Sequence, residues 1–405
     1  MLFIFNRFRI FPVAVLLLMS CHSIEKEKAV PEAKPYHIDL PAGNLSTEEK
    51  NSLSKKCSEW FDSVLAPANF NGGILVAKNG VPVYERYVGN VVPKGSEPFT
   101  AETPVHIASV SKTFTAMAVL KLMEQGKLDL DDSVSRFLPE FNYPGVTVKT
   151  LLNHRSGIPN YAYFMEDLGW DKSEFISNHN ILRALITQKD KIKNIGRPDA
   201  SFSYCNTNFA LLALIIEKAS GMGYADYLQK EFFDPLNMKH TFVFTLKDTA
   251  RATSSYDWRG DLIKLDFLDQ VYGDKNIYST VRDLLIWDRA LASGKLFKSE
   301  TMKLAFTPYS NERPGIKNYG LGWRMNVYPT GKKMIFHNGW WHGNNASFIR
   351  LPEQDATIIV LGNRFTRQIY KAHHLADIFD NYNAEPEESD SANPAENHES
   401  QLGSK

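Results

Sequence analysis

The 405-residue sequence has few cysteines, no net charge and none of the best-known hydrolase or metal motifs. Lys and Arg equal Asp and Glu at 46 each, so no overall field draws in nucleic acid. The eleven histidines form no His-Glu-x-x-His cluster, which argues against metal catalysis. There is also no Gly-x-Ser-x-Gly elbow to support a Ser-His-Asp hydrolase. We therefore expect no nucleic-acid partner, no metal and no cofactor.

The N-terminal segment lacks the length of a membrane span but has the features of a signal. After a basic start, the apolar stretch from Phe11 to Met19 ends in Leu18-Met19-Ser20-Cys21. This ending resembles a bacterial lipobox, in which the signal is removed and the cysteine is diacylated. We expect residues 1–20 to be a lipoprotein signal peptide and Cys21 to anchor the protein in the bacterial cell envelope, facing the periplasm or the cell surface. An ordinary signal peptide or an uncleaved anchor is the alternative.

Two further segments lack the apolar residues of a core. Residues 21–45 are polar and contain three prolines, as is typical of a tether. Residues 381–405 are rich in Glu, Asp, Ser, Asn and Pro, which predicts a disordered acidic tail. Nothing in the sequence places Cys57 and Cys205 together, so both are expected to be free thiols. A folded domain is therefore expected over residues 46–380.

That domain carries strand patterns near both ends and helix patterns over about residues 105–300. We expect an amphipathic first helix from Thr47 to Leu65, a last helix from Thr366 to Phe379, and a type I′ hairpin turn at Asn79-Gly80. The strand-like runs are Gly73–Lys78, Val81–Arg86, Lys333–Phe336, Ala346–Arg350 and Ala356–Leu361, and the long central helices are Val110–Gln125, Phe209–Ala219 and Thr280–Ala292. The pattern predicts an α+β fold: an antiparallel sheet built from both ends of the chain and flanked by helices, with an inserted, mainly helical region.

The motif Ser109-x-x-Lys112 is the first candidate for chemistry. Three-residue spacing on a helix puts both side chains on one face, so the amine can reach the hydroxyl. The residues that follow are apolar nearly all round, which predicts a buried helix and a partly desolvated Lys112. A buried lysine resists its charge, as a proton acceptor for serine requires. The pattern alone is weak, because it recurs at Ser23–Lys26 and Ser52–Lys55, and a helix start with serine caps also produces it.

A second candidate, Tyr204-Cys205-Asn206, opens the apolar helix from Phe209 to Ala219. In an extended segment, two-residue spacing points Tyr204 and Asn206 the same way. A tyrosine near an ammonium group can relay a proton, and an asparagine amide can orient a lysine and a substrate carbonyl. Asn206 is equally a good helix N-cap, so a structural role stays open.

A third candidate, His337-Asn338-Gly339-Trp340, lies at the end of a predicted strand. His337 and Gly339 share one face of that strand, and the glycine lets a substrate approach the backbone closely. A lone histidine on a strand is also typical of a hydrogen-bonded structural residue. Each of the three motifs is ambiguous, and the interpretation depends on their order along the chain.

Taken together, Ser-x-x-Lys, Tyr-x-Asn and His-x-Gly in this order resemble the motifs of the serine β-lactamase and penicillin-binding-protein superfamily. The resemblance is strongest to the class C β-lactamases, the related D-alanyl-D-alanine carboxypeptidases and the esterases of the same fold. It covers about Thr47 to Phe379. Four further segments look like the family's framework: Phe70–Gly89, Leu151–Pro159, Ile277–Leu284 and Tyr319–Trp323.

The resemblance implies a role for each motif residue in an acyl-transfer site. Ser109 would be the nucleophile, Lys112 and Tyr204 the shared base and acid, and Asn206 the orienting amide. The backbone N–H groups of Ser109 and Trp340 would form the oxyanion hole. His337, Asn338 and Gly339 would line the acyl site on the strand side. The expected substrate is a small-molecule or peptide acyl compound, namely an ester, a D-amino-acid peptide or a β-lactam.

One departure from the family pattern concerns the strand motif. Many β-lactamases have Lys-Thr-Gly where this chain has His337-Asn338-Gly339. Lysine is a fixed cation for a substrate carboxylate, whereas histidine is largely neutral near pH 7 and would be a weak, switchable cation at lower pH. This favours esterase or D-amino-acid peptidase activity over strong β-lactamase activity. The main alternative of another class is a catalytically weak protein that binds cell-wall peptides or penicillin.

Overall fold

The computed structural model describes residue 2 and residues 38–382. Nearly all of the predicted signal peptide, Cys21, most of the predicted tether and nearly all of the predicted acidic tail lie outside the described residues. Within the described ranges, no helix is long and apolar enough to cross a membrane. Cys57 and Cys205 are both buried free thiols, as predicted.

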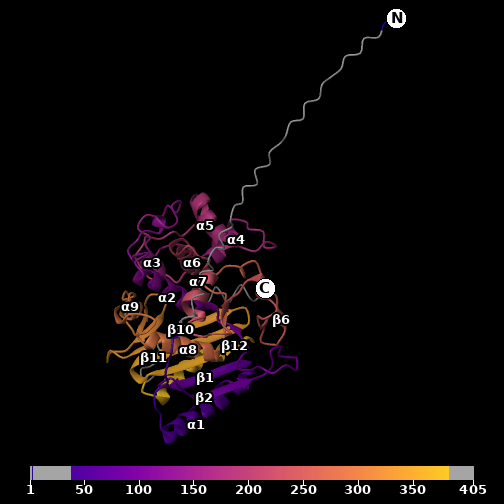
Figure 1. Ribbon diagram of the computed structural model, residues 1–405, viewed down its shortest axis with the longest axis vertical. Coiled ribbons are helices and arrows are strands. Elements are labelled where there is room, and N and C mark those ends of the chain that lie inside the picture. The colour runs from indigo at the N-terminus through magenta and orange to yellow at the C-terminus, as the bar shows by residue number, and fades with distance from the viewer. Residues whose placement is uncertain (1, 3–37, 383–405) are drawn as a thin grey trace. The chain divides into compact units, whose positions relative to one another are not determined.

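The centre of the fold is an antiparallel sheet of seven strands in the order β2-β1-β12-β11-β10-β9-β8. Its strands are β1 (Gly72–Lys78), β2 (Val81–Val88), β8 (Lys317–Tyr319), β9 (Arg324–Val327), β10 (Lys333–Trp341), β11 (Asn344–Leu351) and β12 (Ala356–Gly362). β1 pairs with β12, with Ile74 opposite Val360. The indigo and yellow strands therefore lie side by side in Figure 1. The prediction of one sheet made from both ends of the chain is confirmed.

The hairpin between β1 and β2 turns at Asn79-Gly80, as predicted. Both residues have positive φ, 54° and 73°, which is the backbone conformation that an Asn-Gly pair adopts most readily. β1 is buried along nearly its whole length, whereas β2 at the sheet edge is mostly half-buried. The hairpin thus places a fully apolar strand inside the sheet and a more polar one at its edge.

One face of the sheet is covered by the two ends of the folded domain. Helix α1 (Thr47–Val64) lies against β2, and the 3₁₀-helical segment η8 (Arg367–Ile378) lies against β11 and β12. In Figure 1, α1 is found beside β2. Ser46 caps α1 by accepting a hydrogen bond from the backbone N–H of Glu49 at 3.1 Å. The predicted last helix is present over nearly its predicted range, but with the tighter 3₁₀ winding.

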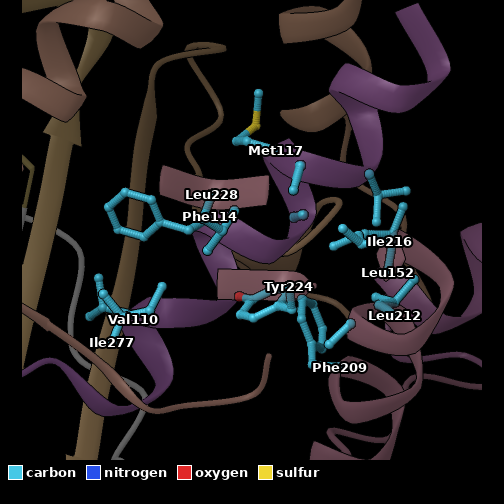
Figure 2. Packing of buried hydrophobic residues seen from close by; sticks show 14 of the residues in the cluster. Val110, Phe114, Met117, Leu152, Phe209, Leu212, Ile216, Tyr224, Leu228 and Ile277 are labelled. Atoms are coloured by element: carbon cyan, nitrogen blue, oxygen red, sulfur yellow. The ribbon is translucent and has the colours of Figure 1, made fainter. Parts of the chain in front are cut away.

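The opposite face carries the predicted helical region. Helix α8 (Val281–Ala292) packs on β1 and β12, while α2 (Ser111–Glu124) packs against α6 (Asn206–Ser220). Figure 2 shows side chains of α2 and α6, including Phe114, Met117, Phe209 and Leu212, in one apolar cluster. The other α-helices of the described residues are α3 (Val148–Leu152), α4 (Tyr161–Asp167), α5 (Asn178–Thr187), α7 (Tyr224–Leu228) and α9 (Ser299–Ala305).

Two small sheets complete the described fold. One has the order β3-β7-β4, and the other pairs β5 with β6. Their strands are β3 (Val105–His106), β4 (Phe242–Val243), β5 (Ser255–Tyr256), β6 (Leu262–Ile263) and β7 (Ile277–Ser279). The β3–β7 pair matters for the site, because β3 leads directly into the Ser109 segment and β7 follows the loop that contacts Lys112.

Candidate active site

Ser109 lies in a single 3₁₀ turn, η2 (Ala108–Val110), between β3 and α2. Ala108 has a φ of 47°, in the left-handed region that costs a residue with a side chain about 1–2 kcal/mol. Its backbone N–H donates to His106 Nδ1 at 3.1 Å, which helps to hold the strained turn. A strained turn before a serine is typical of a site where the surrounding structure fixes the hydroxyl in place.

Lys112 is completely buried one helical turn after Ser109. Its Nζ donates to Ser109 Oγ at 2.8 Å and to the backbone carbonyl of Asp274 at 2.8 Å. The rings of Tyr204 and Phe209 lie beside it, with their centroids 5.0 and 5.8 Å from Nζ. The burial is more complete than the partial desolvation predicted from the sequence.

Tyr204 reaches the same hydroxyl from the helical region. Its OH donates to Ser109 Oγ at 3.0 Å. The preceding Ser203 donates its backbone N–H to the carbonyl of His154 at 2.8 Å, and Cys205 donates its N–H to His154 Nδ1 at 3.1 Å. The buried imidazole of His154 therefore fixes the segment that carries Tyr204, and its ring packs on the tyrosine at a centroid distance of 4.4 Å.

Asn206 lies close to this group but in a different backbone geometry from the one predicted. Cys205 is extended and precedes the helix, whereas Asn206 is already the first residue of α6. Strand alternation therefore does not relate Tyr204 to Asn206, and Cys205 takes the N-cap position that the sequence offered to Asn206. Asn206 is nonetheless buried beside Thr207, whose hydroxyl accepts a hydrogen bond from the backbone N–H of Tyr161.

Strand β10 runs past the nucleophile segment and extends through the His-Asn-Gly motif, further than the predicted strand. A Cβ on Gly339 would lie 2.4 Å from the carbonyl oxygen of Ile107 and 3.1 Å from the backbone N of Ser109. Only glycine lets the two backbones approach this closely. The predicted shared face of His337 and Gly339 is present, because both are buried on alternate positions of β10.

The other two residues of the strand motif use their side chains for structural contacts. Asn338 Oδ1 accepts a hydrogen bond from the Ser347 hydroxyl at 3.0 Å, and it lies on the face opposite His337. Trp340 Nε1 donates to the carbonyl of His342 at 2.7 Å. The indole N–H of Trp340 is therefore used in a contact within its own chain segment, and the role of its backbone N–H in an oxyanion hole stays a prediction.

His337 is fully buried, and the structure corrects its predicted behaviour. Its Nδ1 lies 2.7 Å from the carbonyl of Asn338 and its Nε2 lies 3.3 Å from Tyr319 OH, as suits a neutral ring protonated on Nδ1. Burial, followed by the charges of Arg324 and Lys112, lowers the pKa of His337 well below its usual value. The expectation that His337 is a weak, switchable cation is therefore wrong.

Arg324 on β9 is a site residue that the sequence reasoning missed. It pairs in register with Phe336, directly before His337 on the neighbouring strand, and its guanidinium carbon lies 4.9 Å from the centroid of the Tyr204 ring. A fixed positive charge therefore stands beside the predicted acyl site. The signal that could have found it is pairing between neighbouring strands, but β9 is only four residues long and was not predicted.

A separate cluster of possible metal ligands lies near the end of β10. Ligand atoms of Asp266, Asp269 and His342 lie within 4.8 Å of one another. Burial lowers the pKa of His342, but hydrogen bonding to Asp269 and its charge outweigh burial, so the net shift is upward. The His342 Nε2 atom lies 3.0 Å from Asp269, whose other oxygen accepts a hydrogen bond from Trp341 Nε1. Two of the three members, Asp269 and His342, thus form a hydrogen-bonded ion pair.

The structure thus brings Ser109, Lys112, Tyr204, His337 and Gly339 to one place, and adds Arg324 and the carbonyl of Asp274. It turns the side chains of Asn338 and Trp340 to other contacts. A serine hydroxyl that is hydrogen-bonded to an amine and a phenol, with the backbone of Gly339 close by, is suited to nucleophilic attack on a carbonyl carbon.

Comparisons with known proteins agree with this geometry. The family model described as "Beta-lactamase" matches residues 61–379. Penicillin-binding protein 4* of Bacillus subtilis (strain 168) is 30% identical over 332 residues, which cover 78% of this chain and 73% of that protein. The octameric penicillin-binding protein homologue from Pyrococcus abyssi superposes with a TM-score of 0.68 at 26% identity, covering 80% of this chain and 77% of that one. A class C β-lactamase has the same fold, with a TM-score of 0.69 at 19% identity over 84% of this chain and all of its own.

Proposed function

Because the chain belongs to the beta-lactamase family, we propose that it acts as a serine hydrolase of the β-lactamase and penicillin-binding-protein superfamily. More specifically, we propose a peptidase for D-amino-acid peptides that forms an acyl-enzyme on Ser109. The observation that carries the proposal is the pair of hydrogen bonds that Ser109 Oγ accepts from Lys112 Nζ and Tyr204 OH. A serine hydroxyl that is hydrogen-bonded to two proton carriers is arranged for activation as a nucleophile.

In the proposed reaction, Ser109 Oγ attacks the scissile carbonyl carbon as its proton passes to the Lys112–Tyr204 unit. The same unit then protonates the leaving amine, and the carbon–nitrogen bond breaks. A water attacks the Ser109 ester in the second half, with the proton returning through the same groups. The backbone N–H groups of Ser109 and Trp340 would bind the oxyanion in both halves, a contribution typically on the order of a hundredfold or more in rate per donor.

Arg324 supports a peptide with a terminal carboxylate as the substrate class. Because His337 is held neutral, it cannot supply the cation that a carboxylate needs. Arg324 supplies a charge that is fixed at any physiological pH, and its planar group suits a bidentate carboxylate. We therefore propose that Arg324 binds the carboxylate next to the scissile bond. Neutral esters would be accepted without this contact, as the predicted esterase activity requires.

The nucleophile is tested by labelling with a fluorophosphonate probe, followed by peptide mass mapping. We expect the label on Ser109 and its loss in Ser109→Ala. Ser52→Ala is the matched control, because Ser52 and Lys55 have the same spacing on the exposed surface of α1. Labelling that persists in Ser109→Ala, or that disappears in Ser52→Ala, contradicts the proposal.

The substrate class is tested with Arg324→Gln, and with Arg324→Lys as the charge-conserving control. We expect Arg324→Gln to lower kcat/KM for a D-alanyl-D-alanine peptide by about tenfold or more relative to a neutral p-nitrophenyl ester, the size of a lost charge-assisted contact. Arg324→Lys should keep part of the preference. Equal losses on both substrates would exclude a carboxylate role for Arg324. Stable acylation without turnover would instead indicate a protein that only binds penicillin or cell-wall peptides.

We also propose that Cys21 is lipidated and holds the domain at the bacterial cell envelope. The support is the sequence alone, namely the apolar stretch that ends in Leu18-Met19-Ser20-Cys21. Cys21→Ala should release the protein into the soluble fraction or leave its precursor unprocessed. A variant that is still cleaved and still partitions into detergent would refute the anchor.

A further inference from the structure

Two buried charged residues beside Lys112 are not used by the proposed mechanism. Asp274 is completely buried and Lys275 is 3% exposed, and both lie in the loop that precedes β7. Burying an ionised side chain is expensive unless its partners compensate for the lost water. A buried aspartate–lysine pair, whose aspartate contacts the candidate general base through its backbone carbonyl, therefore needs an explanation beyond packing.

The backbone and the side chain of Asp274 face different partners. Its carbonyl accepts the hydrogen bond from Lys112 Nζ at 2.8 Å. Its carboxylate oxygen Oδ2 accepts a hydrogen bond from Tyr161 OH at 2.8 Å and lies 3.5 Å from Lys275 Nζ. Lys275 Nζ also donates to Tyr161 OH at 2.5 Å. Tyr161 and Lys275 thus fix the residue whose carbonyl holds Lys112.

Lys275 is itself enclosed by rings rather than by solvent. Its Nζ lies 4.6 Å from the centroid of Trp341 and 5.2 Å from that of Tyr161. The other oxygen of Asp274, Oδ1, is buried and has no hydrogen-bond partner among the described residues. A carboxylate kept in a low-dielectric site with an incomplete set of hydrogen bonds exerts a strong field on nearby charges.

The groups that face Lys112 from the other packed elements are neutral or positive. Ser109 is hydrogen-bonded to both Lys112 and Tyr204. The other titratable groups around Lys112 are His154, Cys205, His337 and Arg324. Lys275 is faced by Asp274 and also by Asp266, Asp269, His106 and His342. Asp274 contacts both lysines: its backbone carbonyl accepts the hydrogen bond from Lys112, and its carboxylate lies beside Lys275.

Building on the proposed function, we infer that Asp274 is a positioning residue that, together with Lys275 and Tyr161, sets the protonation of the Lys112–Tyr204 unit. The carboxylate favours a charged Lys112, and the ammonium of Lys275 opposes it. The balance of the two determines the pH at which the unit can take the proton of Ser109.

The inference predicts shifts of opposite sign from two charge-removing variants. Asp274→Asn keeps the carbonyl that holds Lys112 but removes the negative charge, so neutral Lys112 becomes easier to form and the apparent pKa of the unit falls. Lys275→Met removes a nearby positive charge and raises that apparent pKa. The double variant loses both charges and should return close to wild type.

The experiment is the pH profile of kcat/KM on a neutral p-nitrophenyl ester, which avoids any contribution from Arg324. We expect shifts of about half a pH unit or more, downward in Asp274→Asn and upward in Lys275→Met. Loss of activity without a shift, or shifts in the same direction, would overturn the inference. Either result is distinguishable from failure of the proposed function, which would appear in the wild type as missing acylation of Ser109 or as an acyl-enzyme that does not turn over.

Tyr161→Phe keeps the inference testable if the charge variants do not fold. This change removes a single hydroxyl and leaves the packed ring and both charges in place. Losing the hydrogen bond to Asp274 should lower kcat by between about threefold and tenfold with KM unchanged. Wild-type kcat in Tyr161→Phe would show that the fixed carboxylate does not act on Lys112, and would overturn the inference.

Discussion

The two faces of the central sheet are built from the same strands but bury different kinds of side chain. On the face covered by α1 and η8, the core is mainly apolar and includes Phe61, Ile358 and Leu375, and buried polar residues on it, Asn345 and Ser347, hydrogen-bond to neighbouring side chains. On the face covered by the helical region, apolar packing surrounds buried polar groups such as Lys112 and His337. The difference teaches that one face of the sheet mainly stabilises the fold through buried apolar area, while the other also holds reactive groups in place.

The largest effect should come from the two proton carriers on the helical face. We expect Lys112→Ala and Tyr204→Phe each to lower kcat/KM by about a thousandfold, since each removes a hydrogen bond to Ser109 Oγ. If they act as one unit, the double variant should be little worse than either single variant. Stopped-flow acylation rates on an ester decide the point. A double loss equal to the product of the two single losses would mean that the residues act independently.

The apolar face should show the reverse behaviour, with stability lost and chemistry kept. Ile358 is fully buried in β12 on that face, so Ile358→Ala should lower the free energy of unfolding by about 3 kcal/mol. Urea unfolding measures the loss, and kcat/KM at 25 °C should stay within about twofold of wild type, since no contact with the site is removed. A large fall in kcat in the folded variant would show that the two faces are not separable.

Gly339 tests how closely the sheet must approach the nucleophile. A Cβ there would lie 2.4 Å from the Ile107 carbonyl, so Gly339→Ala must push β10 away from Ser109 and should lower kcat/KM by more than about tenfold. The control is Gly196→Ala, where the nearest atom would be 3.4 Å away. Near-normal acylation by Gly339→Ala, measured with the fluorophosphonate probe, would show that this close approach is not needed.

The smallest effect per residue concerns the buried histidines of the helical face. Burial lowers the pKa of His106 to about 4, and it is the leading cause of the lowered pKa values of His154 and His337. Below pH 6.5 the unfolded chain takes up protons that the folded one does not, so the free energy of unfolding should fall as the pH falls. At pH 5.5 the loss is about 1 kcal/mol for each histidine.

His342 should partly offset this trend, because its pKa is raised in the folded state. Its stabilisation is fully present below the unfolded value and is lost as the pH rises through the folded value. Urea unfolding at pH 7.5 and 5.5 measures the sum, and His337→Gln should reduce the difference between the two pH values. Equal stability at both values, in wild type and variant, would contradict neutral burial of these rings.

The sequence predicted those parts of the molecule that are encoded locally. The Asn79-Gly80 turn, the individual strands and the long central helices follow from residue patterns that act over a few positions. The joining of both ends in one sheet is a non-local pairing, and it was predicted from the positions of those strand patterns along the chain. The Ser109–Lys112 pair was predicted from a local pattern, because helix geometry alone brings the two side chains together.

The parts that were missed depend on contacts between segments far apart in the sequence. No local pattern places the Asp274 carbonyl against Lys112 or Arg324 beside Tyr204. The prediction of a switchable His337 failed because the charge state of the ring depends on its burial. That burial depends on the packing of helices opposite β10, which no local pattern shows. Cys205 rather than Asn206 precedes α6, since the His154 imidazole fixes the extended backbone there.

The pairing of β1 with β12 has a consequence for how the chain folds. Residues 72–78 and 356–362 lie side by side in the sheet, so the contact that joins them closes a loop spanning most of the domain. Closing such a loop costs conformational entropy before any contact repays it, and non-local pairing of this kind slows folding. A chain that stops before Ala356 leaves one edge of β1 without its partner, which exposes unpaired backbone N–H and C=O groups on an apolar strand and invites aggregation. The first strand to be synthesised, β1, can therefore complete its pairing in the sheet only after the last strand, β12, has been made.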